Sequence, residues 1–252
     1  MTNLSVSVAS NSPAILIIPA LIDTTPVSPL QYQSNQGSLV FLLPIRHDIK
    51  KEAVFLCSKN SNPTRSDQLH QTHLLRYLKG TAYLGPTYSA NPLHFPNGVQ
   101  VTSEAKSSHA CHTDGSSHSV YLFRIGNVNA PFFTFSAKES TTLAASPHEA
   151  EYITLGRCAK TCVYFRQFAT DLGFPQTEPT PIKEDNIPAI FLAITRKSRH
   201  IFIKHHYIRW LWQNKIINPI YANTHDVIAD GMTKYQSPAP FLYFRSKLLN
   251  YA

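Results

Sequence analysis

The order of the elements predicted for residues 99–240 indicates an α/β fold with a mixed sheet flanked by helices. Three short segments rich in β-branched and aromatic residues come first, and a long amphipathic helix follows them. A strand, further helices, another strand and a last helix complete the order. The chain has 252 residues, of which 43% are hydrophobic. This length allows one large domain, or one domain with a smaller appendage.

The first three predicted strands lie between residues 99 and 138. The segment 99–104 alternates hydrophobic and polar residues at its start and ends in Glu104. The segments 119–127 and 131–138 are rich in aromatic and β-branched residues, and the sequence GNVNA between them is typical of a turn. These patterns predict three consecutive strands.

A long helix is predicted from Ser146 to Gly173. Ser146 can cap its start, Pro147 suits the first turn, and Glu149 completes a capping box. Hydrophobic residues then recur at steps of three and four, which is the period of one helix face. They are Tyr152, Leu155, Ala159, Cys162, Phe165 and Ala169.

Shorter patterns predict the remaining elements. Hydrophobic residues recur with helical spacing from 69 to 78, within a mostly helical segment, and Gly80 is expected to end this helix. After the long helix, the chain order predicts a strand at 180–186, helices at 187–196 and 199–214, a strand at 217–223, and a last helix opening at 225–234. The expected organisation is an irregular segment at 1–24, a small helical part at 25–98, the α/β domain at 99–240 and a tail at 241–252.

The charge balance points to a polyanionic partner. The formal net charge is +8, with 12 histidines in addition, and nucleic acid is the first candidate partner for a basic surface. The four cysteines are typical of reduced thiols, no segment is long and apolar enough to span a bilayer, and no targeting signal is visible. An intracellular protein that does not enter a membrane is expected.

Isolated carboxylates fall at strand ends and helix starts. Glu151 lies in the first turns of the long helix, Asp185 at the end of a strand, and Asp230 in the first turn of the last helix. With a fourth acid from the first strand, such a set could bind two Mg²⁺ ions for phosphodiester cleavage. Taken singly, each acid also has a simpler interpretation. Asp230 could be an acid that stabilises a helix start, and Asp185 with Asn186 could form a turn.

Six segments in a fixed order resemble one family, the copia-type retrotransposon Pol polyproteins, over the end of reverse transcriptase and the ribonuclease H domain. The resemblance covers residues 25 to 240. The segments are GSLVFLLPIRHDIKKEAVFLCSKNSNPT, HLLRYLKGT, FSAKESTTLAASPHEAEYITL, TPIKEDNIPAI, RHIFIKHHYIR and NTHDVIADGMTK. No polymerase motif of the Tyr-x-Asp-Asp type is present, so reverse-transcriptase activity is not expected.

The resemblance implies a ribonuclease H-like fold at 99–240 and a remnant of the reverse-transcriptase thumb and connection at 25–98. It implies hydrolysis of the RNA strand of RNA–DNA hybrids with two Mg²⁺ ions, and association with other polypeptides of the same element. Glu151, Asp185 and Asp230 match the second, third and fourth metal-binding, catalytic carboxylates. Four further residues match a basic helix that would contact nucleic acid: His200, Lys204, His206 and Arg209.

The first carboxylate has two candidates. When the sequence is aligned with the family motif without gaps, Glu104 occupies the position of the first, metal-binding aspartate. Lys106 then replaces the second acid of the motif. In a rival register Asp114, within HTDGSS, is the first ligand, but its flanking residues are a poor strand. We favour Glu104.

Two departures from the family pattern weaken the expected metal site. The longer side chain of Glu104 displaces the carboxylate from a site that tolerates little error, and Lys106 adds a cation on the same strand face. We therefore expect a nuclease activity that is weakened or lost. The alternative is a non-catalytic nucleic-acid-binding remnant of a mobile element.

Overall fold

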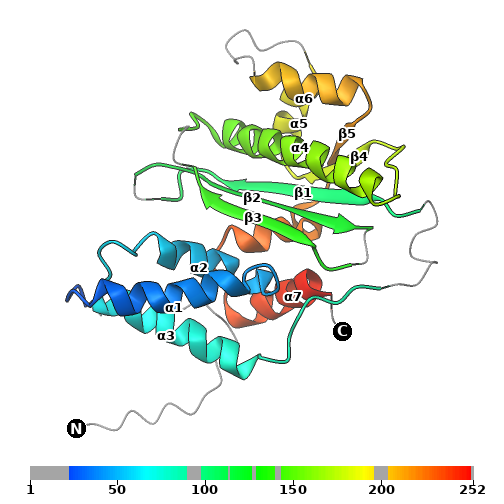
Figure 1. Ribbon diagram of the computed structural model, residues 1–252. Helices are drawn as coiled ribbons and strands as arrows, with labels where there is room; N and C mark the ends of the chain where they lie inside the picture. The colour runs from blue at the N-terminus through cyan, green and yellow to red at the C-terminus, as the bar shows by residue number, and fades with distance from the viewer. Residues whose placement is uncertain are drawn as a thin grey trace. The chain divides into compact units, whose positions relative to one another are not determined.

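A computed structural model of the protein (Figure 1) describes residues 23–89, 98–112, 114–126, 129–139, 143–195 and 204–250, without the side chains of 204–206. The chain divides into two compact units. Of the described residues, the first unit comprises 23–85 together with 235–245, and the second comprises those between 86 and 234 together with 246–250.

The first unit is helical. Its elements are α1 (Pro29–Leu42), the short 3₁₀ helix η2 (His47–Ile49), α2 (Lys50–Cys57), α3 (Arg65–Gly80) and the first part of α7 (Pro238–Leu249). Thr64 and Asp67 form a capping box at the start of α3. Tyr32, Leu39, Leu56 and Leu74 are fully buried between these helices.

A buried polar network ties the first unit together around Asp48. Its carboxylate accepts two hydrogen bonds from Arg46, at 2.8 and 2.9 Å, and one from the Tyr77 hydroxyl at 2.6 Å. Arg245 in turn donates to the Tyr77 oxygen. Because these buried polar groups have partners, the network fixes α3 and α7 against η2 at little desolvation penalty.

The second unit is built on a five-stranded mixed sheet with the strand order β3-β2-β1-β4-β5. The strands are β1 (Val101–Ser108), β2 (His118–Ile125), β3 (Phe133–Lys138), β4 (Thr180–Glu184) and β5 (Ile217–Tyr221). β1 pairs antiparallel with β2, and β2 with β3, whereas β4 pairs parallel with both β1 and β5. The predicted α/β class with a mixed sheet is confirmed.

Three helices lie on one side of this sheet (Figure 1): α4 (Pro147–Asp171), α5 (Ile187–Ile194) and α6 (Lys204–Gln213). The α4 helix packs on β1 and β2, and the Ser146 hydroxyl caps it by accepting the Glu149 N–H, as predicted. The Glu149 side chain accepts the N–H of Ala145 at 2.7 Å, so the other half of the predicted capping box does not form. Gly173 follows the helix with a φ of +88°, a left-handed conformation that favours glycine.

The core of the second unit fills the space between α4 and the sheet. Tyr121, Phe123, Leu155 and Ile182 are buried there, together with Ile208 from α6. The Phe123 ring lies within 4.9 Å of the Phe165 ring, centroid to centroid. The predicted hydrophobic face of α4 is therefore the face that covers the sheet.

The first strand is longer than its sequence suggested. β1 was expected to end at Glu104, but it continues to Ser108 because Ser107 and Ser108 pair with Ser119 and His118 of β2. Small polar side chains are poor strand formers by themselves, and the ladder to β2 supplies the missing stabilisation. Glu104 consequently lies in the middle of a strand, not at its end.

The C-terminal elements differ from the prediction. The helix expected at 225–234 is replaced by two short 3₁₀ helices, η4 (Thr224–Asp226) and η5 (Ile228–Met232). The N–H groups at the start of η5 are bound by a side chain of the sheet, described below. Gly231 also disfavours a longer helix, because glycine in a helix interior is destabilising. The expected tail at 241–252 instead contains most of α7, whose aromatic residues Phe241 and Phe244 are buried.

None of the helices in the described part of the chain is long and apolar enough to cross a membrane.

Replacing Phe123 by alanine should lower the free energy of unfolding of the second unit by about 3–5 kcal/mol, because it leaves a cavity between the sheet and α4. Phe191, which is 53% exposed on α5, provides the control, and Phe191→Ala should change stability by no more than about 0.5 kcal/mol. Chemical denaturation followed by circular dichroism would measure both. Equal losses for the two variants would contradict this assignment of the core.

Candidate active site

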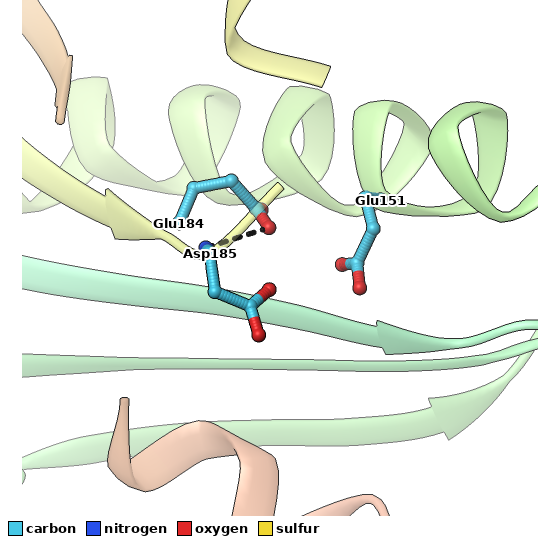
Figure 2. Close-up of side chains that lie close together, drawn as sticks. All are labelled: Glu151, Glu184 and Asp185. Atoms are coloured by element: carbon cyan, nitrogen blue, oxygen red, sulfur yellow. Dashed lines mark hydrogen bonds between the residues drawn. The ribbon is translucent and has the colours of Figure 1, made fainter. Parts of the chain in front are cut away.

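Three carboxylates meet where α4 passes the end of β4 (Figure 2). Glu151, Glu184 and Asp185 each offer an oxygen, and these oxygens all lie within 4.8 Å of one another. Glu151 and Glu184 are buried, and Asp185 is partly buried. This is the only group of three or more potential metal ligands in the described ranges. Two of the four expected ligands, Glu151 and Asp185, are thus brought together.

Lys106 is the fourth member of this cluster. Its ammonium nitrogen donates to Glu151 Oε1 at 2.8 Å and to both Asp185 oxygens, at 2.7 and 2.9 Å. The second Glu151 oxygen accepts the backbone N–H of Ser107 at 2.6 Å. The two carboxylates that the resemblance implies as metal ligands are therefore paired with an internal cation.

The pairing of β1 with β4 explains why a residue at position 106 reaches these acids. Glu104 is level with Lys183 in the parallel ladder. Two residues further along, Lys106 stands beside Asp185, the first residue after β4, and its side chain leaves the same sheet face as that of Glu104. Position 106 is the strand position that adjoins Asp185.

The electrostatics of the cluster reflect this internal ion pairing. Burial would lower the pKa of Lys106, but the charges and hydrogen bonds of Glu151 and Asp185 outweigh it and raise that pKa. Burial raises the pKa of Glu151 to about 7 against the opposing effect of Lys106. Burial also acts to raise the pKa of Asp185, but hydrogen bonds from Lys106 and Thr224 lower it below its usual value.

Glu184 was not among the residues predicted for the site. Its Oε1 accepts the N–H groups of Asp185 and Asn186, at 3.1 and 3.2 Å, while its Oε2 is buried without a hydrogen-bond partner. Burial, followed by the charges of Glu151 and Asp185, raises its pKa well above the usual value. The sequence signal that could have identified it is the two-residue spacing from Ile182, which places Glu184 on the same strand face as this hydrophobic residue.

Glu104 serves another part of the fold. Its Oε2 accepts the N–H groups of Ile228 and Ala229, at 2.6 and 3.2 Å, and its Oε1 lies 3.3 Å from Arg124. The side chain is 3% exposed. Glu104 therefore holds the start of η5 against the sheet, and it is not part of the group of acids around Lys106.

Asp230 and Asp114, the other two candidates, also lie apart from that group. The Asp230 carboxylate pairs with Lys234 at 3.0 Å, one helical turn further along the chain. Asp114 lies in the turn between β1 and β2, where it pairs with Lys138 at 2.5 Å and accepts from Ser116. Its hydrogen bonds to Lys138 and Ser116 lower the pKa of Asp114. Neither candidate for the first carboxylate, Glu104 or Asp114, therefore joins Glu151 and Asp185.

The expected basic helix is described only in part. His200 lies outside the described residues, and so do the side chains of Lys204 and His206. Arg209 is partly buried on α6 and donates to the carbonyl oxygen of Thr195. This contact anchors α6 to the segment that leaves α5.

The cluster fits a divalent metal in its ligand type but not in its arrangement. Carboxylate oxygens are the ligands that Mg²⁺ prefers, and the buried, unpartnered oxygen of Glu184 is suited to a cation. However, the ammonium group of Lys106 lies within hydrogen-bonding distance of three carboxylate oxygens. Mg²⁺ demands a near-ideal octahedron of oxygens, and the lysine occupies the space that it would need. These residues, as arranged, do not fit a two-ion magnesium site.

Comparison with known proteins finds similarity to Pol polyproteins of mobile elements. The chain is 27% identical over 227 residues to the retrovirus-related Pol polyprotein from transposon RE1 of Arabidopsis thaliana, and 26% identical over 225 residues to that from transposon RE2. A third relative, from transposon TNT 1-94 of Nicotiana tabacum, is 24% identical over 212 residues. The resemblance to copia-type Pol polyproteins is thus confirmed.

These similarities cover 87%, 87% and 81% of the chain but only 15% of each relative, so the chain spans a small part of their length. No family model matches the chain. Among solved structures, it is similar to the foamy viral protease-reverse transcriptase in complex with RNA/DNA hybrid, with a TM-score of 0.48, 16% identity, and coverage of 80% of this chain and 26% of that one. It is also similar to LC11-RNase H1, with a TM-score of 0.39, 13% identity, and coverage of 53% and 91%.

Replacing Glu184 by glutamine should stabilise the second unit at neutral pH. The folded protein holds the Glu184 proton at pH values where the unfolded chain has released it, so this residue reduces stability as pH rises above its ordinary pKa of 4.5. The variant should match the wild type near about pH 4 and exceed it by about 1–3 kcal/mol near about pH 8. Denaturation at both pH values measures the difference, with the exposed Glu178→Gln as control. An increase in stability that is the same at both pH values would contradict the raised pKa of Glu184.

Replacing Glu104 by alanine should release η5. The change leaves the N–H groups of Ile228 and Ala229 without their acceptor and Arg124 without its carboxylate, at a loss of about 3–5 kcal/mol. Hydrogen exchange at these two amides should accelerate. Glu104→Gln retains an acceptor oxygen and should have a smaller effect. Unchanged exchange in the alanine variant would show that other contacts hold η5.

Proposed function

We propose that this chain is a retrotransposon-derived ribonuclease H-like protein that binds nucleic acid but has lost most or all of its nuclease activity. The ancestral reaction is hydrolysis of the RNA strand of an RNA–DNA hybrid with two Mg²⁺ ions. The observation that carries the proposal is the position of the Lys106 ammonium group between Glu151 and Asp185.

The ion pair competes directly with metal binding. Lys106 is tethered to β1 beside the acids, whereas Mg²⁺ must enter from solution and give up part of its hydration shell. A divalent ion would have to displace the ammonium group and would then lie next to it, at an unfavourable energy of several kcal/mol in a partly buried site. The lysine therefore protects the carboxylates from metal.

The remaining expected ligands support the same conclusion. Glu104 binds the start of η5 and pairs with Arg124, and Asp230 pairs with Lys234. Of the four carboxylates that the family resemblance implied, only two share a site. We therefore assign no catalytic step to these residues.

Nucleic acid remains the partner that the charge favours. A net charge of +8 promotes binding to phosphate backbones, independent of a metal centre. Arg209, with His200, Lys204 and His206 of the basic segment, would contribute contacts to phosphates. RNA–DNA hybrid is the proposed ligand, since it is the substrate of the ancestral reaction. Other element-encoded polypeptides are proposed as further partners on the resemblance alone.

The wild type should bind Mg²⁺ weakly, and Lys106→Asp should bind it at least about tenfold more tightly, because a positive charge beside the ion becomes a negative one. Isothermal titration calorimetry measures this without any activity. A labelled RNA–DNA hybrid with Mg²⁺ should stay intact in the presence of the wild type.

Lys160→Asp makes the same charge change at an exposed position of α4 and should not alter metal binding. Adding Glu151→Gln to Lys106→Asp should abolish the gained affinity. If the wild type cleaves the hybrid in a Mg²⁺-dependent way and Asp185→Asn does not, the proposal is wrong and the protein is an active nuclease.

A further inference from the structure

An exposed hydrophobic stripe follows one face of the second half of α4 and continues to the residue after it. Tyr164, Phe168 and Leu172 recur at steps of four residues and are 64%, 50% and 60% exposed. Side chains four positions apart lie on the same helix face. The opposite face of α4 is buried in the core through residues such as Leu155 and Cys162. The helix is therefore hydrophobic on two faces, and the core covers one of them.

The aromatic rings of this stripe are held in place by the core. The rings of Tyr164 and Phe168 are nearly parallel, with 9° between their planes and 6.4 Å between their centroids. The Tyr164 ring also lies edge-on to the ring of Phe165, which in turn contacts Phe123 and Phe133 of the sheet. Side chains that are already ordered lose little conformational entropy on binding, so the stripe is suited to docking against another surface.

A basic and an acidic residue border the stripe at its two ends. Lys160 lies one turn before Tyr164, and Asp171 is the last residue of α4; both are exposed. They are separated by about three helical turns and thus lie on the same face. Within the described residues neither forms a salt bridge, and Asp171 accepts a hydrogen bond from the Gln167 side chain at 2.8 Å. The face therefore carries a positive end and a negative end.

We propose that this face of α4 pairs with the same face of a second copy of the chain, in an antiparallel arrangement with a two-fold axis midway between Lys160 and Asp171. In this register Lys160 of one copy lies opposite Asp171 of the other, and the two-fold axis makes this ion pair twice. Tyr164 of one copy lies next to Phe168 of the other, so four aromatic rings form the centre of the interface and the charges form its rim. A parallel arrangement would instead place each lysine opposite its own counterpart.

This interface goes beyond the proposed function. It uses neither the cluster around Lys106 nor the basic segment that would contact nucleic acid, so the interface and the proposed function are tested separately. A single helix face gives a small contact area, and small interfaces are typical of weak, reversible association. A dimer with a dissociation constant in the micromolar range is therefore expected.

Sedimentation velocity over a range of protein concentrations tests the hydrophobic stripe. The wild type should form a dimer as its concentration rises, and Phe168→Glu should weaken the dimer at least about tenfold, because it places a charge at the centre of the interface. Phe191 on α5 is similarly exposed, at 53%, and Phe191→Glu is the matched control that should leave the dimer unchanged. Circular dichroism shows whether each variant is folded.

Charge reversal tests the antiparallel register. Lys160→Glu and Asp171→Lys each place like charges opposite one another twice in the dimer, so each should weaken it about fivefold or more. An equimolar mixture of the two variants should dimerise as well as the wild type, because one variant then has two acids on this face and the other has two lysines. Glu178→Lys reverses an exposed acid beyond the end of α4 and should behave like the wild type by itself.

The outcomes decide between this interface and its alternatives. A wild type that stays monomeric, or a dimer that Phe168→Glu weakens no more than Phe191→Glu does, contradicts the interface. Charge variants that fail to dimerise when mixed overturn the antiparallel register, whereas recovery of the dimer in the mixture supports it. If the wild type is monomeric and binds the RNA–DNA hybrid, the interface is wrong and the proposed function stands. If the dimer forms as expected and the hybrid does not bind, the proposed function is wrong and the interface stands.

Discussion

The parallel pairing of β1 with β4 is the constraint on which the candidate site depends. Only two pairs define its register, Ser103 with Ile182 and Glu104 with Lys183. That register sets which side chain of β1 stands next to Asp185. A shift by one residue would place Lys106 on the opposite face of the sheet, and the buried carboxylates of the cluster would lose their cation.

The cluster around Lys106 is a closed arrangement of charges. Glu151 and Asp185 neutralise the ammonium group through short hydrogen bonds, and Glu184 adds a third acid that favours retaining its proton. Buried charges are costly unless each has a partner, and here the partners come from three different elements. The contacts therefore link α4, β1 and the end of β4 at the point where the family resemblance implies metal ligands.

Much of the second unit could be predicted from local sequence. The strand patterns, the Ser146 cap and the hydrophobic face of α4 are local features, and the structure reproduces them. The end of β1 and the replacement of the last predicted helix by η5 depend on contacts distant in sequence, including the bonds from Glu104 to residues 228 and 229. Likewise, Lys106 was recognised as an unfavourable neighbour of a metal, but its direct contacts with two acids required the strand register.

A tethered ammonium group differs from a bound metal in that it cannot leave. Its local concentration beside Glu151 and Asp185 is set by the covalent chain and is independent of the surrounding solution. Chelating agents and fluctuations in cellular magnesium would thus leave the electrostatic field at this end of the sheet unchanged. With Lys106 as a counterion supplied by the chain itself, the charge balance of Glu151 and Asp185 does not depend on any ion taken from solution.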